Sequence, residues 1–313
     1  MKVGVPREIK KHEYRVGLTP AAVREYVAAG HSVTVEATAG DGIGASDDNY
    51  RRVGGSIVGS ASEIFASCEM IVKVKEPQPS EWIQLREEQI LFTYLHLAPD
   101  PDQAKGLMKS GCTAIAYETV TDKFGGLPLL APMSEVAGRL AIEAAGSALR
   151  RYAGGRGLLT GGVAGVPPAR IAVIGGGVVG TNAARMAVGL GAEVSILDRS
   201  IARLRDLDEL FGGRVRTRFS TLDAVEEEVF AADAVIGAVL VPGASAPKLV
   251  SREMLKSMRR GAVLVDVAID QGGGASRLLA QRHTPNRPLR LMVSFTIALQ
   301  TCPVQSRLPP ARH

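Results

Sequence analysis

The sequence predicts an α/β protein with two doubly wound domains joined by a long helix, followed by a C-terminal tail that we expect to be disordered. Short apolar runs closed by Gly or Pro alternate with helical stretches, as parallel sheets require. A G-x-G-x-x-G turn stands between one such run and a helix. The 313 residues are 46% hydrophobic, and 35 Gly with 4% aromatic residues suit many tight turns. We therefore expect domains at 1–128 and 129–274, then an aberrant basic tail at 275–313.

A capped helix and several short strands make up the first predicted domain. In TPAAVREYVAAG, Thr19 can cap a helix, Pro20 fits its first position and Gly30 ends it. MKVGVP before this helix and HSVTVEA after it are typical of strands. Further β-prone runs are MIVKVKEP (70–77), QILFTYLHLAPD (89–100) and TAIAYETV (113–120). Their alternation with helical stretches favours a mostly parallel sheet.

The second domain is introduced by a long helix. SEVAGRLAIEAAGSALRRYAGG begins at Ser134, has helical spacing and ends in Gly-Gly, so we expect it to link the domains. A Gly/Pro-rich loop, GLLTGGVAGVPPA, follows. The remaining β-prone runs are RIAVIGGG (170–177), GAEVSILD (191–198), AADAVIGAVLVPG (231–243) and GAVLVDVAID (261–270).

The turn at Gly175, Gly177 and Gly180 has the spacing of a dinucleotide-binding, Rossmann-like βαβ unit. Gly175 permits the tight turn, Gly177 lets the backbone approach a pyrophosphate at the helix N-terminus, and Gly180 allows close helix–strand packing. Asp198, at the end of the next strand, would accept hydrogen bonds from the ribose hydroxyls and repel a 2′-phosphate. We therefore predict NAD rather than NADP as the cofactor, although the neighbouring Arg199 weakens that preference.

Charge and cysteine content exclude several classes of function. The net charge of +5 arises from six Arg, with no Lys and no acidic residue, between 275 and 313. The first 274 residues are close to neutral and have no basic face, so we expect no nucleic-acid partner. Three Cys show neither paired nor metal-ligand spacing, which fits a reducing cytoplasm and no metal. The charged start and the lack of a long apolar run predict neither a signal peptide nor a membrane span.

Three polar residues of the first domain are candidates for chemistry. Arg15 follows a charged loop, and Lys75 and His96 lie near the ends of apolar runs, where doubly wound folds place functional groups. A Lys at a strand end is more often solvated, however, and a lone His in an apolar run is more often a core residue. Spacing alone leaves both interpretations open.

Several long motifs resemble the alanine dehydrogenase family, which is related to the nicotinamide-domain part of pyridine nucleotide transhydrogenase. They are VGVPREIKKHEYRVGLTP, VKVKEPQ, LFTYLHLAP, AYETV, LPLLAPMSEVAGRLA, IGGGVVGTNAARMA, GAVLVPGASAPKLV and VLVDVAIDQGG, and they run from Met1 to about Gly274. The resemblance implies reversible oxidative deamination, in which L-alanine, NAD+ and water give pyruvate, ammonium and NADH. It also implies a homohexamer.

Site residues follow from the resemblance position by position. Arg15 would bind the substrate carboxylate and Lys75 its carboxylate or carbonyl, while His96 would be the general acid/base and Asp270 the second catalytic residue. Their chemistry suits these roles: a guanidinium fork for a carboxylate, a cation for a developing oxyanion, an imidazole for proton transfer. The expected cofactor-binding residues are Ser134, Gly175, Gly177, Val178, Val179, Gly180, Asp198, Arg203, Ser220, Val239, Leu240, Val267, Ala268, Ile269 and Asp270.

Two alternatives remain open at this stage. A non-catalytic NAD(H)-binding, transhydrogenase-like module would not need Lys75 and His96 beside a substrate. A dehydrogenase of another amino acid, of the lysine or opine type, is the second alternative, because nothing in the sequence alone measures the pocket for the substrate side chain.

The family's pattern is not readable after Gly274. The genetic code suggests why. If the third base of each codon of residues 295–307 is read together with the first two bases of the next codon, each shifted codon can encode the corresponding residue of a stretch in the family's pattern. That stretch is Tyr-Cys-Val-Ala-Asn-Met-Pro-Gly-Ala-Val-Pro. Residues 277–284 treated in the same way allow its Ser-Arg-Pro-Thr-Thr-His stretch. We therefore expect that a frame slip near Gly274 replaced the C-terminus, that the tail supplies no strand, and that this copy has little or no activity.

Overall fold

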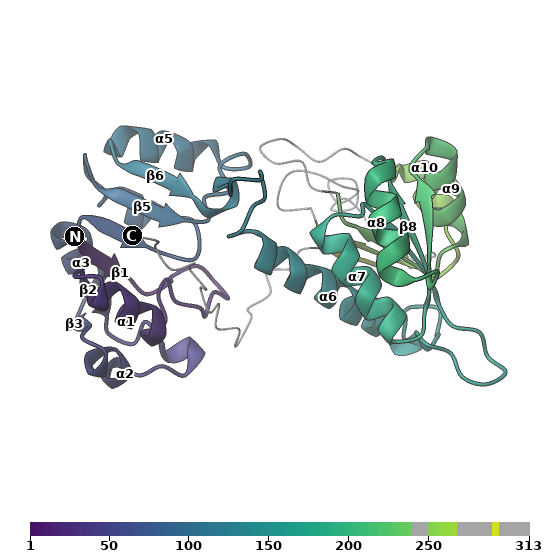
Figure 1. The fold of residues 1–313 in the computed structure, drawn as a ribbon, viewed down its shortest axis with the longest axis horizontal. Coiled ribbons are helices and arrows are strands. Elements are labelled where there is room, and N and C mark those ends of the chain that lie inside the picture. Colours follow the sequence, from purple (N-terminus) through teal and green to yellow (C-terminus); the bar gives the residue numbers. More distant parts are fainter. Residues whose placement is uncertain (240–248, 268–289, 294–313) are drawn as a thin grey trace. The chain divides into compact units, whose positions relative to one another are not determined.

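The computed structural model describes residues 1–239, 249–267 and the main chain of 290–293 (Figure 1). The chain divides into two compact units, with the boundary between Leu129 and Leu130. Each unit contains one six-stranded, fully parallel sheet, so the prediction of two doubly wound α/β domains is confirmed.

The first unit has the strand order β3-β2-β1-β4-β5-β6. Its strands are β1 (Lys2–Val5), β2 (Ser32–Glu36), β3 (Ser56–Val58), β4 (Met70–Val72), β5 (Ile90–Thr93) and β6 (Thr113–Ala116). Its helices are α1 (Pro20–Ala28), α2 (Asp47–Arg52), α3 (Ala61–Ser67), α4 (Pro79–Trp82) and α5 (Pro101–Ser110), with short 3₁₀ turns η1 (Asp41–Ile43) and η2 (Tyr117–Thr119). The order reverses between β1 and β4, the point at which such sheets bind ligands.

Local sequence explains why these elements form where they do. Thr19 caps α1 by accepting a hydrogen bond from Ala22 N–H at 3.3 Å, and Pro20 begins the helix, as predicted. In β1, Val3 and Val5 face one apolar cluster, while a Cβ on Gly4 would meet the side chain of Ile64 in α3 on the other face. Both faces of the sheet are therefore covered by helices, and polar side chains stand in the loops that follow the strands.

The second unit repeats the same order, as β12-β11-β10-β7-β8-β9. Its strands are β7 (Arg170–Ile174), β8 (Glu193–Asp198), β9 (Val215–Phe219), β10 (Ala234–Gly237), β11 (Val263–Asp266) and β12 (Arg290–Val293). Its helices are α6 (Ala131–Ala148), α7 (Val178–Gly189), α8 (Ile201–Phe211), α9 (Leu222–Ala231) and α10 (Arg252–Ser257), with a 3₁₀ turn η3 (Arg151–Ala153). The order here reverses between β7 and β10.

Helix α6 differs from its predicted bounds at both ends. It begins at Ala131, before the expected Ser134, because Pro132 suits a first turn and Ser134 N–H already donates to Leu130 C=O at 3.1 Å. It ends at Ala148 and is followed by η3, which closes on Gly154 at φ +84°. Within the second unit α6 packs closely on α7, since a Cβ on Gly138 would collide with the Val179 carbonyl (Figure 1).

The expectation that residues 275–313 supply no strand is wrong for 290–293. Strand β12 pairs in parallel with β11, from Val263 opposite Arg290 to Asp266 opposite Val293. The stretch Arg-Leu-Met-Val is largely apolar and β-prone, and this holds whether or not a frame slip produced it. Strand β11 therefore has a neighbour on this side. The expected disorder of the remaining tail lies outside the described residues.

Within the described residues, no helix has both the length and the apolar character needed to cross a bilayer.

Candidate functional site

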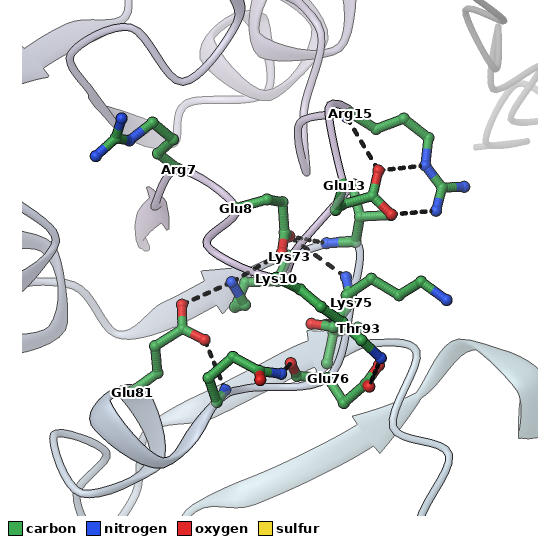
Figure 2. A network of polar contacts seen from close by, with 12 residues as sticks. Arg7, Glu8, Lys10, Glu13, Arg15, Lys73, Lys75, Glu76, Glu81 and Thr93 are labelled. Atoms are coloured by element: carbon green, nitrogen blue, oxygen red, sulfur yellow. Dashed lines mark hydrogen bonds and ion pairs between the residues drawn. The ribbon is translucent and has the colours of Figure 1, made fainter. Parts of the chain in front are cut away.

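Arg15 lies in the loop between β1 and α1, and neighbouring residues hold it in place. A Cβ on Gly17 would collide with the carbonyl of Val72, so this glycine lets the loop lie against the end of β4. The Arg15 Nε donates to the buried carboxylate of Glu13 at 2.7 Å, and its Nη2 pairs with the second carboxylate oxygen (Figure 2). This two-point pair fixes the plane of the guanidinium and aligns it as a carboxylate receptor requires.

Lys75 follows β4, and its main chain is held from both sides. Its N–H donates to Glu8 at 3.3 Å, and its C=O accepts from the hydroxyl of buried Thr93 at 2.9 Å. Among the residues that the structure describes, its ammonium has no ion-pair partner. Figure 2 shows this side chain extending to the same side of the polar network as the Arg15 guanidinium. Lys75 is therefore a cation held at its backbone, with its charge available to a ligand.

His96 follows β5 in a left-handed backbone conformation, with φ at +47°. The Glu118 carboxylate accepts from the N–H groups of Leu95 at 3.1 Å and of His96 at 2.7 Å. Two successive N–H groups around one anion form a nest, and this contact stabilises a conformation that is rare outside Gly and Asn. The half-buried imidazole stacks on the ring of Tyr94 at 6.1 Å between centroids. An unusual backbone held this firmly at a strand end favours a functional residue over a core histidine.

The structure brings these three predicted residues to one edge of the first sheet. Their loops follow β1, β4 and β5, which are consecutive neighbours in the sheet. Burial raises the pKa of Tyr94 to about 12, and the nearby Arg15 charge opposes that rise. Arg15 therefore lies close enough to the β5 loop to act on Tyr94. Two cations and an imidazole therefore stand in loops at the carboxyl edge of this sheet, where ligands bind in doubly wound folds.

The Glu13–Arg15 pair predicts an acid-dependent stability. Burial alone raises the pKa of Glu13, but the hydrogen bonds and charge of Arg15 outweigh it and lower that pKa below the ordinary 4.5. The contribution is therefore present above 4.5 and is lost as the pH falls through the lowered pKa. At neutral pH, we expect Glu13→Gln to reduce the free energy of unfolding by about 1–3 kcal/mol, and the deficit to shrink on acidification. Urea unfolding across this range measures it, with exposed Glu25→Gln as the control, and a deficit independent of pH would contradict it.

In the second unit, the glycine turn follows β7 and opens α7. Gly175 has φ +104°, which other residues rarely adopt, and a Cβ there would meet Val239 and the Ala238 carbonyl. A Cβ on Gly180 would collide with the Gly175 carbonyl, whereas one on Gly177 would meet nothing within 4 Å. Packing thus explains Gly175 and Gly180. Gly177 instead keeps an open approach to the helix N-terminus, which fits a bound pyrophosphate.

Asp198 and Arg203 both hold the glycine turn. Asp198 accepts from Gly176 N–H at 2.7 Å and from Ser200 N–H at 2.8 Å. Arg203 donates to Gly176 C=O at 2.8 Å and to Thr181 Oγ1 at 2.7 Å. The main chain of Gly176 is therefore held at both its N–H and its C=O group. Each Asp198 oxygen accepts one of these bonds and has a further lone pair, so the carboxylate can still receive ribose hydroxyls.

The other predicted cofactor residues lie at several places in this unit. Val178 and Val179 form the first turn of α7, and Ser134 lies near the start of α6. Ser220, Val239 and Val267 follow β9, β10 and β11, so they lie on the carboxyl edge of the sheet. Leu240, Ala268, Ile269 and Asp270 lie outside the described residues.

Sequence reasoning missed the carboxylates that support the site. They are Glu8, Glu13, Glu81 and Glu118, together with Lys73 and Thr93, which contact them or Lys75. Their one local signal was the charged run after β1, and such a run usually marks a solvated loop. Neither Glu8 nor Glu118 is close in sequence to the residues that it holds.

A glycine turn at a helix N-terminus, with an acidic residue at the end of the next strand, places this chain in the class of dinucleotide-binding α/β proteins. Comparison with known families narrows this class. The family model described as "Alanine dehydrogenase/PNT, N-terminal domain" matches residues 4–137. The model "Alanine dehydrogenase/PNT, C-terminal domain" matches residues 141–288, past the Gly274 at which readable motifs end.

Individual relatives agree with the family models. Alanine dehydrogenase of Halomonas elongata is 58% identical over 273 residues, covering 87% of this chain and 74% of the relative. That of Mycobacterium tuberculosis (strain ATCC 25618 / H37Rv) is 53% identical with the same coverage. A solved L-alanine dehydrogenase has a TM-score of 0.81 at 52% identity, covering 87% of this chain and 75% of that one. A transhydrogenase from Sinorhizobium meliloti gives 0.74 at 29% identity, covering 88% and 81%. The chain belongs to the alanine dehydrogenase/PNT family.

Proposed function

We propose that this chain catalyses the NAD-dependent, reversible oxidative deamination of L-alanine to pyruvate and ammonium. The observation that carries the proposal is the placement of Arg15, Lys75 and His96 in the loops that follow three adjacent strands of one sheet. A module that only carried a dinucleotide would need no such group. The high identity to alanine dehydrogenases supports alanine as the substrate.

Arg15, Lys75 and His96 of the first unit have different roles in the proposed reaction. Arg15, with its plane fixed by Glu13, binds the substrate carboxylate. The Lys75 ammonium stabilises negative charge on the substrate oxygen as the carbinolamine forms and collapses to pyruvate and ammonium. His96 takes and returns the proton of that oxygen, because an imidazole titrates near neutral pH. Asp270, proposed as the second catalytic residue, lies outside the described residues.

The second unit fits NAD through its own residues. When bound, NAD+ accepts the hydride from the substrate Cα. The open side of Gly177 leaves room for the pyrophosphate, and Asp198 accepts the ribose hydroxyls and disfavours a 2′-phosphate. The residues that follow β9 to β11 border the same edge and complete the proposed binding surface.

The proposal is tested by binding NADH and then adding pyruvate with ammonium. We expect NADH to bind, NADPH to bind more weakly, and NADH to be oxidised when both pyruvate and ammonium are present. An enzyme-excess, single-turnover format detects slow chemistry as well as fast. Binding without oxidation would instead support the transhydrogenase-like module. Oxidation with a different oxo-acid alone would support a dehydrogenase of another amino acid.

We also propose that this copy of the enzyme turns over its substrate slowly, because its amino-acid sequence after Gly274 departs from the family's pattern. Sequencing the DNA through that position tests the frame slip, which fails if 275–313 lie in the frame of a longer homologue. A steady-state rate matching that of the Halomonas relative would contradict the impairment without contradicting the function.

A homohexamer in the cytoplasm is the expected assembly. Family membership supports the oligomer, and the unpaired Cys68 and Cys112 fit a reducing compartment. Light scattering of the purified chain measures the mass, and a monomer would contradict the hexamer.

A further inference from the structure

A buried ionic cluster lies beneath the Arg15–Lys75 edge of the first unit. Lys73 pairs with Glu8 at 3.1 Å and with Glu81 at 2.7 Å, and these side chains are 0%, 2% and 4% exposed, respectively. Burial raises the pKa of Glu8, whereas the two carboxylates raise that of Lys73 despite its burial. Two carboxyl groups within hydrogen-bonding distance favour the charged form of the lysine. A buried cluster of this kind contributes little net stability against an apolar replacement, so its presence calls for another reason.

Glu8 reaches from this cluster to the main chain that carries Lys75. One carboxylate oxygen faces Lys73, and the other accepts from Val74 N–H at 2.6 Å and from Lys75 N–H at 3.3 Å (Figure 2). From the other side, Thr93 Oγ1 donates to Lys75 C=O. The main-chain ladder with β5 ends here, with Lys73 N–H donating to Phe92 C=O at 3.1 Å and Val74 C=O accepting from Tyr94 N–H at 3.3 Å. The next polar groups, Val74 N–H and both main-chain groups of Lys75, are held by side chains.

We propose that Glu8 is a positioning residue for Lys75, oriented by Lys73, and that it sets where the Lys75 ammonium meets the substrate. The inference rests on the proposed function, which assigns Lys75 to the substrate carboxylate or carbonyl. Lys73 holds one Glu8 oxygen and so turns the other toward the two N–H groups. Glu81 also contacts Lys73, at 2.7 Å, but its second oxygen accepts from Gln78 N–H at 2.7 Å, at the start of α4, and not from Lys75.

Glu8 and Glu81 form a matched pair for a test. Each gives one oxygen to Lys73 and the other to backbone N–H groups. A Glu→Gln change at either site replaces a buried carboxyl group by an amide with a single carbonyl oxygen, which cannot serve both partners. We expect that oxygen to stay with the Lys73 ammonium, so that the loss falls on Val74 and Lys75 in Glu8→Gln and on Gln78 in Glu81→Gln.

The experiment compares both variants with the unchanged chain. We expect Glu8→Gln to raise the KM for pyruvate by about tenfold, with little change at Glu81→Gln and the same NADH affinity in both. We also expect amide hydrogen exchange to quicken at Val74 and Lys75 in Glu8→Gln only, and at Gln78 in Glu81→Gln only. Equal effects of the two variants on KM, or unchanged exchange at Lys75 in Glu8→Gln, would overturn the proposal.

Two further points keep the test decisive. Amide exchange does not depend on turnover, so this role of Glu8 stays testable in a chain that turns over slowly or not at all. If Glu8→Gln does not fold, Thr93→Val removes the hold on Lys75 from the other side without changing charge. We expect a rise in KM there and its rescue in Thr93→Ser, which keeps the hydroxyl. A rise that Thr93→Ser fails to rescue would contradict positioning.

Discussion

Replacing His96 by Asn is expected to slow alanine-dependent NADH formation by about 10²–10⁴-fold, the usual contribution of a positioned general acid/base. Asn tolerates the left-handed conformation that this position adopts, at φ +47°. The N–H groups that Glu118 holds belong to the backbone and remain in place. The change therefore removes the imidazole and little else. Single-turnover mixing with NAD+ and L-alanine measures the rate.

A matched control exists in the same unit. His12 is exposed and also has a positive φ, of 64°, so His12→Asn makes the same substitution in the same backbone conformation. We expect it to leave the rate and the NADH affinity unchanged. Equal rates for His96→Asn and the unchanged chain would remove His96 from the proposed chemistry.

Alanine substitutions in the glycine turn are expected to separate cofactor binding from folding. Gly180→Ala pushes a Cβ into the Gly175 carbonyl, so we expect a loss of about 1–3 kcal/mol in unfolding free energy, together with weaker NADH binding. Gly177→Ala meets nothing within 4 Å in the protein. Its stability should be unchanged, and its NADH affinity should fall by about tenfold or more, because the backbone no longer approaches the pyrophosphate freely. Urea unfolding and NADH titration measure the two effects.

Gly189 supplies the control for both changes. It lies at the other end of α7, and a Cβ there also meets nothing within 4 Å. We expect Gly189→Ala to change neither NADH affinity nor, beyond a small helix-propensity gain, stability. If Gly177→Ala bound NADH as tightly as Gly189→Ala, the turn would not be where the pyrophosphate lies.

Much of the fold was predictable because local signals agreed with the tertiary structure. Thr19, Pro20 and Gly30 bracketed α1, and the frame from β7 to β8 followed from the spacing of its glycines. The start of α6 was less predictable, because Leu130 caps it without a side-chain hydrogen bond and Ser134 offered a stronger but misleading cap signal. Strand β12 was missed because the sequence around its four residues shows no helical or strand periodicity.

Only the residues proposed to contact the substrate could be predicted from the sequence, and the side chains that hold them in place could not. Lys75 and His96 stood near strand ends and Arg15 in the loop after β1, so the topology alone brings them to one edge. Their supports depend on distance in space: Glu8 lies 65 positions from Lys73, and Glu118 lies 22 from His96. No spacing rule joins such pairs. The left-handed turn at His96 was also invisible, because a carboxylate distant in sequence holds it and no glycine marks it.

Hydride transfer from alanine is the most direct test of the central claim. L-alanine with deuterium at Cα is mixed with NAD+ and an excess of the 313-residue chain, and the reduced cofactor is analysed by mass spectrometry. We predict NADH that carries one deuterium per molecule, with an equal amount of pyruvate. Bound NAD+ that stays oxidised, or NADH without the label, would contradict the assignment of this chain as an alanine dehydrogenase.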